Sequence, residues 1–286
     1  MSFLNSVNTN TGAMIALQAL NKTNSQLAAA QKQVSTGFRV ADSTDDGAAY
    51  AIAQNVRSTV GALGSANQQL GNVQGLLSTT QSSLNNISNT MTSMRDVLVK
   101  LSDSSVTSTD RTNYIAQYNS LLSNVKTFIQ DANYNGKTLV GDISGGSGTF
   151  ARVAVVRNES GASYAVATYS GSALFGSISY SSTQLNAATT VQGIIGTATT
   201  ASFINKFNAL NNELNTIGSA QKYVSNQVSY NSDKIDALNT GIGALVDADL
   251  AQESAQLQAL QIRQQLGTQA LSLANQAPQT LLSLFK

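Results

Sequence analysis

The stretch that decides the fold is "VRSTVGALGSANQQLGNVQGLLSTTQSSLNNISNTMTSMRDVL", residues 56–98. An apolar residue recurs at every seventh position throughout it, a spacing typical of one long helix with a coiled-coil-like seam. Polar residues at the intervening positions, such as Asn67 and Ser88, make this seam weak on its own. The helix seam consists of Val56, Leu63, Leu70, Leu77, Leu84, Met91 and Leu98.

A matching pattern lies near the other end of the chain, between residues 203 and 245. Apolar residues alternate there at spacings of four and three, and only Gln221 and Asn231 are polar. The pattern predicts a helix of roughly 60 Å, at about 1.5 Å per residue. Two amphipathic helices of similar length predict a mainly α fold of long, antiparallel, coiled-coil-like helices. Leu210, Ile217, Val224 and Leu238 belong to this second seam.

The middle of the chain changes character. Residues 110–130 have a helical stripe that ends before the turn signal Asn135-Gly136. Beyond it, "TFARVAVV" (149–156) and "ASYAVATY" (162–169) are typical of two strands joined by the turn "RNESG". We expect "LFGSISY" (174–180) to form a third strand. Residues 141–196 are therefore predicted to be a small β-hairpin insertion in a helical framework.

The two ends of the chain form a third class of segment. Apolar residues at helical spacing are embedded there among Gln, Asn, Thr and Ser, so a lone helix should be marginal in water. We expect both ends to be largely disordered in a free monomer and to fold only against neighbouring molecules. The predicted assembly residues are Leu17, Leu20, Leu27, Val34, Leu250, Leu257, Leu260 and Leu271.

Charged residues gather in "STGFRVADSTDDGAAYAIA", residues 35–53, although only 11% of the chain is charged. Gly37 follows a helical pattern, as the left-handed residue after a helix usually does. Ser43 and Asp46 have the spacing of a capping box, and Asp45 would lie in the same first turn. We interpret the stretch as a junction between helices. A metal site would need further ligands, and an acid–base pair would need a pocket.

Composition excludes several classes of function. The chain has no His, Cys or Trp, which removes the commonest general base, the thiolate nucleophile and the usual zinc and copper ligands. Its 16 basic and 15 acidic residues give no electrostatic footprint for nucleic acid or an anionic membrane. No apolar run is long enough to span a membrane, and no secretory signal peptide is expected. We therefore expect no enzyme activity, no cofactor and no metal.

Three segments resemble bacterial flagellins. "LNKTNSQLAAAQKQVSTGFRVADSTDDGAAYAIA" (20–53) is similar to the family's N-terminal region, and "YNGKTLV" (134–140) to a site further along it. "DADLAQESAQLQALQIRQQLGTQALSLANQAPQTLLSLF" (247–285) resembles the C-terminal region. The resemblance covers about 1–140 and 200–286. Residues 141–196 match no pattern of the family, as expected for its variable region.

The resemblance implies an architecture and a function. Residues 1–42 and 247–286 would form an inner helical domain, and 43–140 with 197–246 the filament-core domain. The family polymerises head-to-tail into the extracellular flagellar filament for swimming, after export in an unfolded state through the flagellar type III apparatus. Implied partners are copies of itself, an export chaperone on the C-terminal helix, and the filament cap and hook-associated proteins.

One departure concerns innate immune recognition. Many flagellins carry an Arg-x-Arg-Glu-Leu segment that the innate flagellin receptor recognises, whereas the similar place here contains Ser93-Met94-Arg95-Asp96-Val97. The missing first arginine predicts weak or absent recognition.

Three other functions remain open from the sequence. A hook–filament junction protein would share the terminal helices but occur in few copies. A secreted membrane-active translocator would release dye from liposomes without growing filaments. The β insertion could also serve as an adhesin or glycan-binding site, which its deletion would test.

Overall fold

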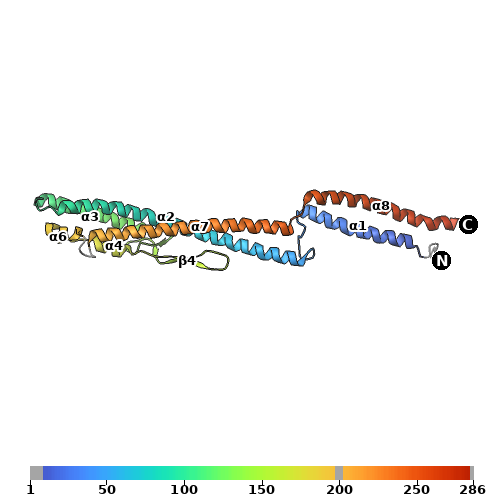
Figure 1. Cartoon of the computed structure of the whole chain (residues 1–286), viewed down its shortest axis with the longest axis horizontal. Coiled ribbons are helices and arrows are strands. Elements are labelled where there is room, and N and C mark those ends of the chain that lie inside the picture. Colours follow the sequence, from blue (N-terminus) through green and yellow to red (C-terminus); the bar gives the residue numbers. More distant parts are fainter. Residues whose placement is uncertain (1–8, 197–201, 284–286) are drawn as a thin grey trace. The chain divides into compact units, whose positions relative to one another are not determined.

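The computed structural model describes residues 9–196 and 202–283, with the backbone alone for 277–283. Helices dominate these residues, which confirms the mainly α fold with a small β insertion (Figure 1). The helices are α1 (Thr11–Thr36), α2 (Gly47–Leu101), α3 (Ser108–Gln130), α4 (Gly171–Ile178), α5 (Ser182–Asn186), α6 (Ala188–Ile195), α7 (Phe203–Val246) and α8 (Leu250–Ser283). The strands are β1 (Lys137–Thr138), β2 (Thr149–Phe150), β3 (Val153–Val156) and β4 (Ser163–Val166).

The chain divides into two compact units. One contains Met1–Thr59 and Asp236–Lys286, and the other contains Val60–Ile235. Both divisions fall inside the long helices α2 and α7, whereas the resemblance to flagellins implies boundaries near 42 and 247. The first turns of α2 belong to the terminal unit because Ala49 and Ala53 pack with Val246. Residues 141–196 belong to the central unit, whose core they share.

The central unit is built around the seam of α2. Leu63, Leu70, Leu77, Leu84, Met91 and Leu98 are all buried, as are Leu210, Ile217 and Val224 of α7. Helix α3 closes this core with Tyr118, Val125 and Ile129. Full burial of each such side chain contributes about 1.5–3 kcal/mol, which offsets the poor helix propensity of the many Ser, Thr and Asn residues. The remaining seam residues, Val56 and Leu238, are half-buried in the terminal unit.

Polar pairs between α2 and α7 fix their relative direction in the central unit. Asn231 Nδ2 donates to Asn67 Oδ1 at 2.9 Å, and Gln221 Nε2 donates to Ser78 Oγ at 3.1 Å. A third pair joins Ser88 Oγ to Asn211 at 3.2 Å. Residue numbers rise along α2 as they fall along α7, so the helices are antiparallel as predicted. Asn67 and Ser88 are polar interruptions of the seam of α2, and each forms a hydrogen bond with a residue of α7.

The insertion contains less β structure than expected. Strands β3 and β4 form the predicted antiparallel hairpin, while β1 and β2 form a separate two-residue parallel pair. The expected third strand at 174–180 is wrong, because most of this segment lies in α4. The hydroxyl of Ser170 accepts a hydrogen bond from Ala173 N and caps this helix, which buries Leu174 and Ile178 on one face.

Candidate assembly surface on the terminal helices

Helix α1 has a defined cap at each end. The side chain of Asn10 accepts a hydrogen bond from Ala13 N at 3.0 Å at the start of the helix. Gly37 ends it with φ 75°, and its N–H donates to Gln33 O. The left-handed glycine predicted after this helix is therefore confirmed, and its conformation is one that a side chain at this position would strain.

Helices α1 and α8 lie side by side in the terminal unit (Figure 1). Their shared buried cluster is small and consists of Leu27, Ala30 and Leu260, with Leu257 packed against it. Gly267 of α8 faces Leu20, and a Cβ at Gly267 would approach Leu20 Cδ1 to 3.2 Å. The pair is therefore in close contact along one line but has little enclosed core.

Large apolar side chains remain in solvent on both helices. The terminal apolar set, as we call it, consists of Met14, Ile15, Leu17, Leu250, Ile262, Leu266 and Leu273. Ile15 is 67% exposed and Leu266 is 58% exposed, so more than half of each residue's surface remains accessible to water. Within a single chain these side chains gain only part of the free energy that their full burial would contribute.

The eight predicted assembly residues divide into three groups. Leu27 and Leu260 are buried between α1 and α8, whereas Leu17 and Leu250 are exposed. Half-buried positions are occupied by Leu20, Val34, Leu257 and Leu271. The sequence reasoning missed Met14 and Ile15 on α1, and Ile262, Leu266 and Leu273 on α8. The spacing of four and seven residues among the last three could have shown a second apolar stripe on α8.

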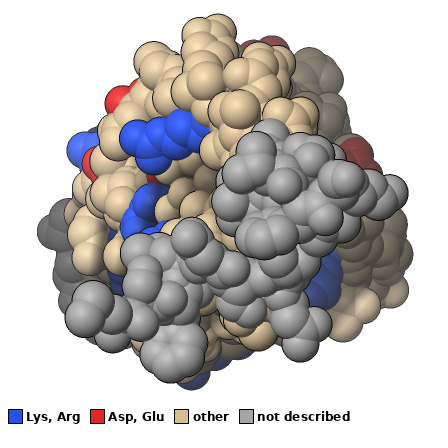
Figure 2. Space-filling view, turned by 90° about the vertical axis from the view of Figure 1, so that its right-hand side faces the viewer, with Lys and Arg blue, Asp and Glu red and all other residues tan. Residues whose placement is uncertain are grey.

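These two helices carry few charges. Helix α1 contains only Lys22 and Lys32, and α8 only Glu253 and Arg263. Among the coloured residues in Figure 2, charged side chains take up less area than uncharged ones. Helix α1 has no acidic residue in its first turn and no basic residue in its last. A surface of this kind can be covered without removing many ions from water, which lowers the cost of association.

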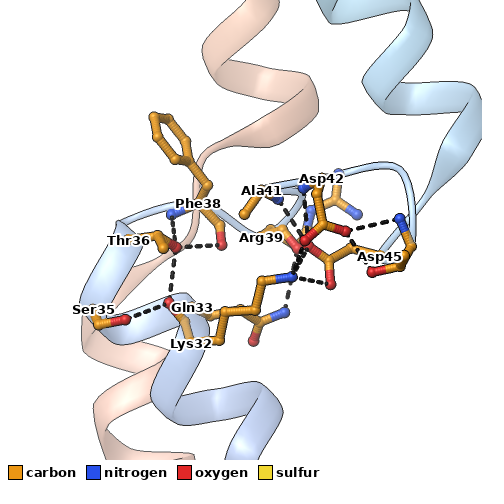
Figure 3. Close-up of polar contacts among 10 residues, drawn as sticks. Lys32, Gln33, Ser35, Thr36, Phe38, Arg39, Ala41, Asp42 and Asp45 are labelled. Atoms are coloured by element: carbon orange, nitrogen blue, oxygen red, sulfur yellow. Dashed lines mark hydrogen bonds and ion pairs between the residues drawn. The ribbon is translucent and has the colours of Figure 1, made fainter.

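A network centred on Lys32 holds the junction that follows α1 (Figure 3). Lys32 Nζ lies 2.7 Å from Asp42 Oδ2 and 2.8 Å from Asp45 Oδ2. The Asp45 carboxylate also accepts hydrogen bonds from Ala41 N at 3.0 Å and Asp42 N at 3.2 Å. Hydrogen bonds from Lys32 lower the pKa values of both aspartates and raise the pKa of Lys32 itself. We call this group the junction latch.

The predicted capping box at Ser43 is wrong, and Asp46 is the capping residue. Helix α2 begins at Gly47, and Asp46 Oδ1 accepts hydrogen bonds from Ala48 N and Ala49 N, each at 3.0 Å. Asp45 lies outside the helix because its carboxylate is used by the preceding turn and by Lys32. The acidic run thus serves two purposes, a latch and a helix cap.

The segment after Gly37 also joins the end of α7. Arg39 N and Val40 N both donate to the carbonyl of Val246, and Arg39 Nη2 donates to Leu245 O at 2.6 Å. Val40 is buried with Ile242 and Val246. The loops that enter and leave the long helices are therefore bonded to each other, which positions α1 and α8 as a pair.

Neither a metal centre nor a membrane span is found among residues 9–196 and 202–283. No three of their acidic side chains gather as ion ligands would, and none of their helices has the length and apolarity of a bilayer-crossing segment.

Long antiparallel helices in one unit, and paired terminal helices with uncovered apolar side chains in the other, are features that suit a subunit associating with further copies. Comparison with known proteins agrees. The bacterial flagellin N-terminal helical region matches residues 7–144, and the C-terminal helical region matches 203–285. The chain belongs to the bacterial flagellin family, whose members are structural subunits of the flagellar filament.

Relatives match over the whole chain. The sequence is 32% identical to flagellin FljM of Caulobacter vibrioides over 99% of both chains. It is also 32% identical to a flagellin of Brucella melitensis, over 98% of this chain and 99% of the relative. Among solved structures, a putative flagellar hook-associated protein from Vibrio parahaemolyticus has a similar fold, with a TM-score of 0.59 at 14% identity over 71% of this chain and all of the other.

Proposed function

We propose that this flagellin polymerises head-to-tail into the extracellular filament by covering the terminal apolar set with neighbouring copies. The observation that carries the proposal is the exposure of large apolar side chains on both α1 and α8, which share only a small buried cluster. Contacts between unlike surfaces of identical subunits generate a filament when the rotation between successive subunits does not close a ring.

Coupled folding of the ends would direct growth to a filament tip. In a free monomer the α1–α8 pair buries few side chains, so we propose that it is largely disordered there. Ordering the ends costs roughly 2–5 kcal/mol of the gross interaction energy, which only a preformed filament end can supply. We also propose export in the unfolded state through the flagellar type III apparatus. A chaperone would cover the C-terminal helix, and the filament cap and hook-associated proteins would be further partners.

Seeded growth tests the proposal. Purified monomer added to short filament seeds should lengthen them in electron micrographs. Leu266→Gln should raise the critical concentration for growth by about five- to twentyfold, because burial of the 58% of Leu266 that is exposed would contribute about 0.9–1.7 kcal/mol.

Val99→Gln is the matched control, since Val99 is similarly exposed (52%) but lies on α2 in the central unit. Normal growth of Leu266→Gln, or equal impairment of both variants, would contradict a specific role for the terminal helices.

Weak recognition by the innate flagellin receptor remains part of the proposal. Ser93, Arg95 and Asp96 are exposed on α2, so the segment is accessible, but it has serine where the recognised motif has its first arginine. Purified monomer should activate receptor reporter cells only weakly, and Ser93→Arg should raise the response. Strong activation by the unmodified protein would refute this.

A further inference from the structure

A groove lies between the hairpin and α7 in the central unit. Its volume is about 370 Å³, and it is lined by Tyr164–Ala167 on and just after β4 and by side chains of α7 from Glu213 to Tyr223. Two features distinguish it from an ordinary surface depression: an unsatisfied carboxylate and a wall of aromatic rings.

Glu213 provides the carboxylate. Its Oε1 atom is buried and has no hydrogen-bond partner among the residues that the structure describes. Burial raises the pKa of Glu213, because loss of water disfavours the charged form. Burial raises the pKa of the Tyr169 phenol, and the nearby negative charge of Glu213 raises it further. A half-buried, charged carboxylate with one oxygen that lacks a hydrogen bond destabilises the subunit at neutral pH.

Two tyrosines form the aromatic wall. The rings of Tyr164 and Tyr223 are stacked with their centroids 4.2 Å apart. Arg157 Nη1 donates to the Tyr223 hydroxyl at 2.9 Å, which holds the ring, while Arg157 Nε is buried without a hydrogen-bond partner among the described residues. Glu213 and Tyr223 are ten residues apart on α7, about 15 Å along the helix, so the carboxylate and the rings line different parts of the groove. The carboxylate can attract a cation through its charge, and the rings can attract one through their quadrupoles.

We propose that the groove receives a lysine or arginine side chain from a second copy of this chain, which pairs with Glu213. This inference rests on the proposed function, because the second copy is a neighbour in the filament.

The subunit has cations available for such a contact. Within the described residues, the three ion pairs use only Lys32 and Lys234. Arg95, Arg152 and Lys222 are exposed on the central unit. A neighbour's cation would give Glu213 the partner that its own chain does not supply, and would favour the assembled state over the monomer.

Glu213→Gln tests whether Glu213 pairs with a neighbour's cation or instead stabilises its own subunit. A stabilising role within the subunit predicts a less stable monomer, whereas pairing with a neighbour predicts a monomer of unchanged or higher stability. The amide keeps the shape and removes the charge that burial disfavours, so thermal unfolding of the monomer should occur at an unchanged or higher temperature. The critical concentration for filament growth should rise about tenfold, equivalent to ~1.4 kcal/mol. Asp233→Asn, an exposed change on the same helix, is the control and should alter neither quantity.

Glu213→Lys adds a second comparison. A repulsive cation in the groove should raise the critical concentration more than Glu213→Gln does, with monomer unfolding measured in parallel. An unchanged critical concentration in Glu213→Gln would overturn the proposal, and so would a less stable Glu213→Gln monomer. If spermidine stabilises wild-type monomer but not Glu213→Gln while filament growth is equal, the groove is a small-amine site instead. Failure of wild-type protein to extend seeds would instead refute the proposed function.

Discussion

Asn10 joins the two ends of the chain through one side chain: its Nδ2 donates to the carbonyl of Ala274 at 2.7 Å while its Oδ1 caps α1. The residues are 264 positions apart in the sequence. Helix α1 therefore begins at the place where it is bonded to α8, and one side chain both caps α1 and links it to α8.

Replacing Asn10 should loosen the start of α1 in two distinguishable steps. Asn10→Ala removes both the cap and the hydrogen bond to Ala274. Loss of the cap alone should lower the stability of α1 by about 1 kcal/mol. Asn10→Asp keeps the cap and loses only the donor. Amide exchange in the first turn of α1, measured in filaments, should rank wild type slowest, then Asn10→Asp, then Asn10→Ala. Equal exchange in all three would show that neither bond matters in the assembled state.

Lys32→Met should release the junction latch. Amide exchange of Ala41 and Asp42 in filaments should accelerate by no more than about fivefold, because the ion pairs are partly exposed. Lys22→Met, an exposed change on the same helix, is the control. An acceleration far above fivefold would contradict this, because it would mean that the Lys32 ion pairs alone hold the junction.

The latch should also depend on pH in one direction. The pKa values of Asp42 and Asp45 are lower in the folded chain than in an unfolded one, chiefly because of their hydrogen bonds with Lys32. The stability that these carboxylates contribute is therefore complete above about pH 4 and is lost as pH falls through the depressed values. Protection of Ala41, corrected for intrinsic exchange, should stay constant from neutral pH to about pH 4 and then fall. Loss of protection between pH 7 and about pH 5 would contradict this assignment.

Asn231→Ala should destabilise the central unit. Asn231 is fully buried, and its Nδ2 donates to Asn67 Oδ1 and to the carbonyl of Arg157 at 3.0 Å. Truncation leaves these partly buried acceptors without their donor, so the free energy of unfolding should fall by about 1–3 kcal/mol in urea titrations of the monomer. Asn226→Ala, exposed on the same helix, should stay within about 0.5 kcal/mol of wild type. Equal stability of the two variants would contradict the role given to Asn231.

The long helices could be predicted from the sequence because apolar residues at every seventh position are typical of a helix with one continuous buried face. Leu70 and Leu77 are buried where the seam predicts them. The partners of Asn67 could not be predicted, since a polar residue in a seam does not reveal which residue of the other helix it meets. That pairing depends on the antiparallel register, which only the folded chain specifies.

The junction shows a different limit. Ser43-x-x-Asp46 has the spacing of a capping box, but Lys32 and the amides of the turn compete for the nearby carboxylates. The decisive contacts link residues ten and thirteen positions apart, outside any local pattern. The short apolar run at 174–180 was ambiguous for another reason: periodicity does not separate a buried strand from a short buried helix over so few residues.

Amide exchange before and after assembly tests most directly whether neighbouring copies complete the terminal helices. In monomers, amides of α1 and α8 should exchange with little protection, while amides in the buried parts of α2 and α7 are protected. In filaments, α1 and α8 should become protected to a similar degree. Strong and equal protection of α1 and α8 in both states would contradict the account, because the helices would then be stable without neighbours.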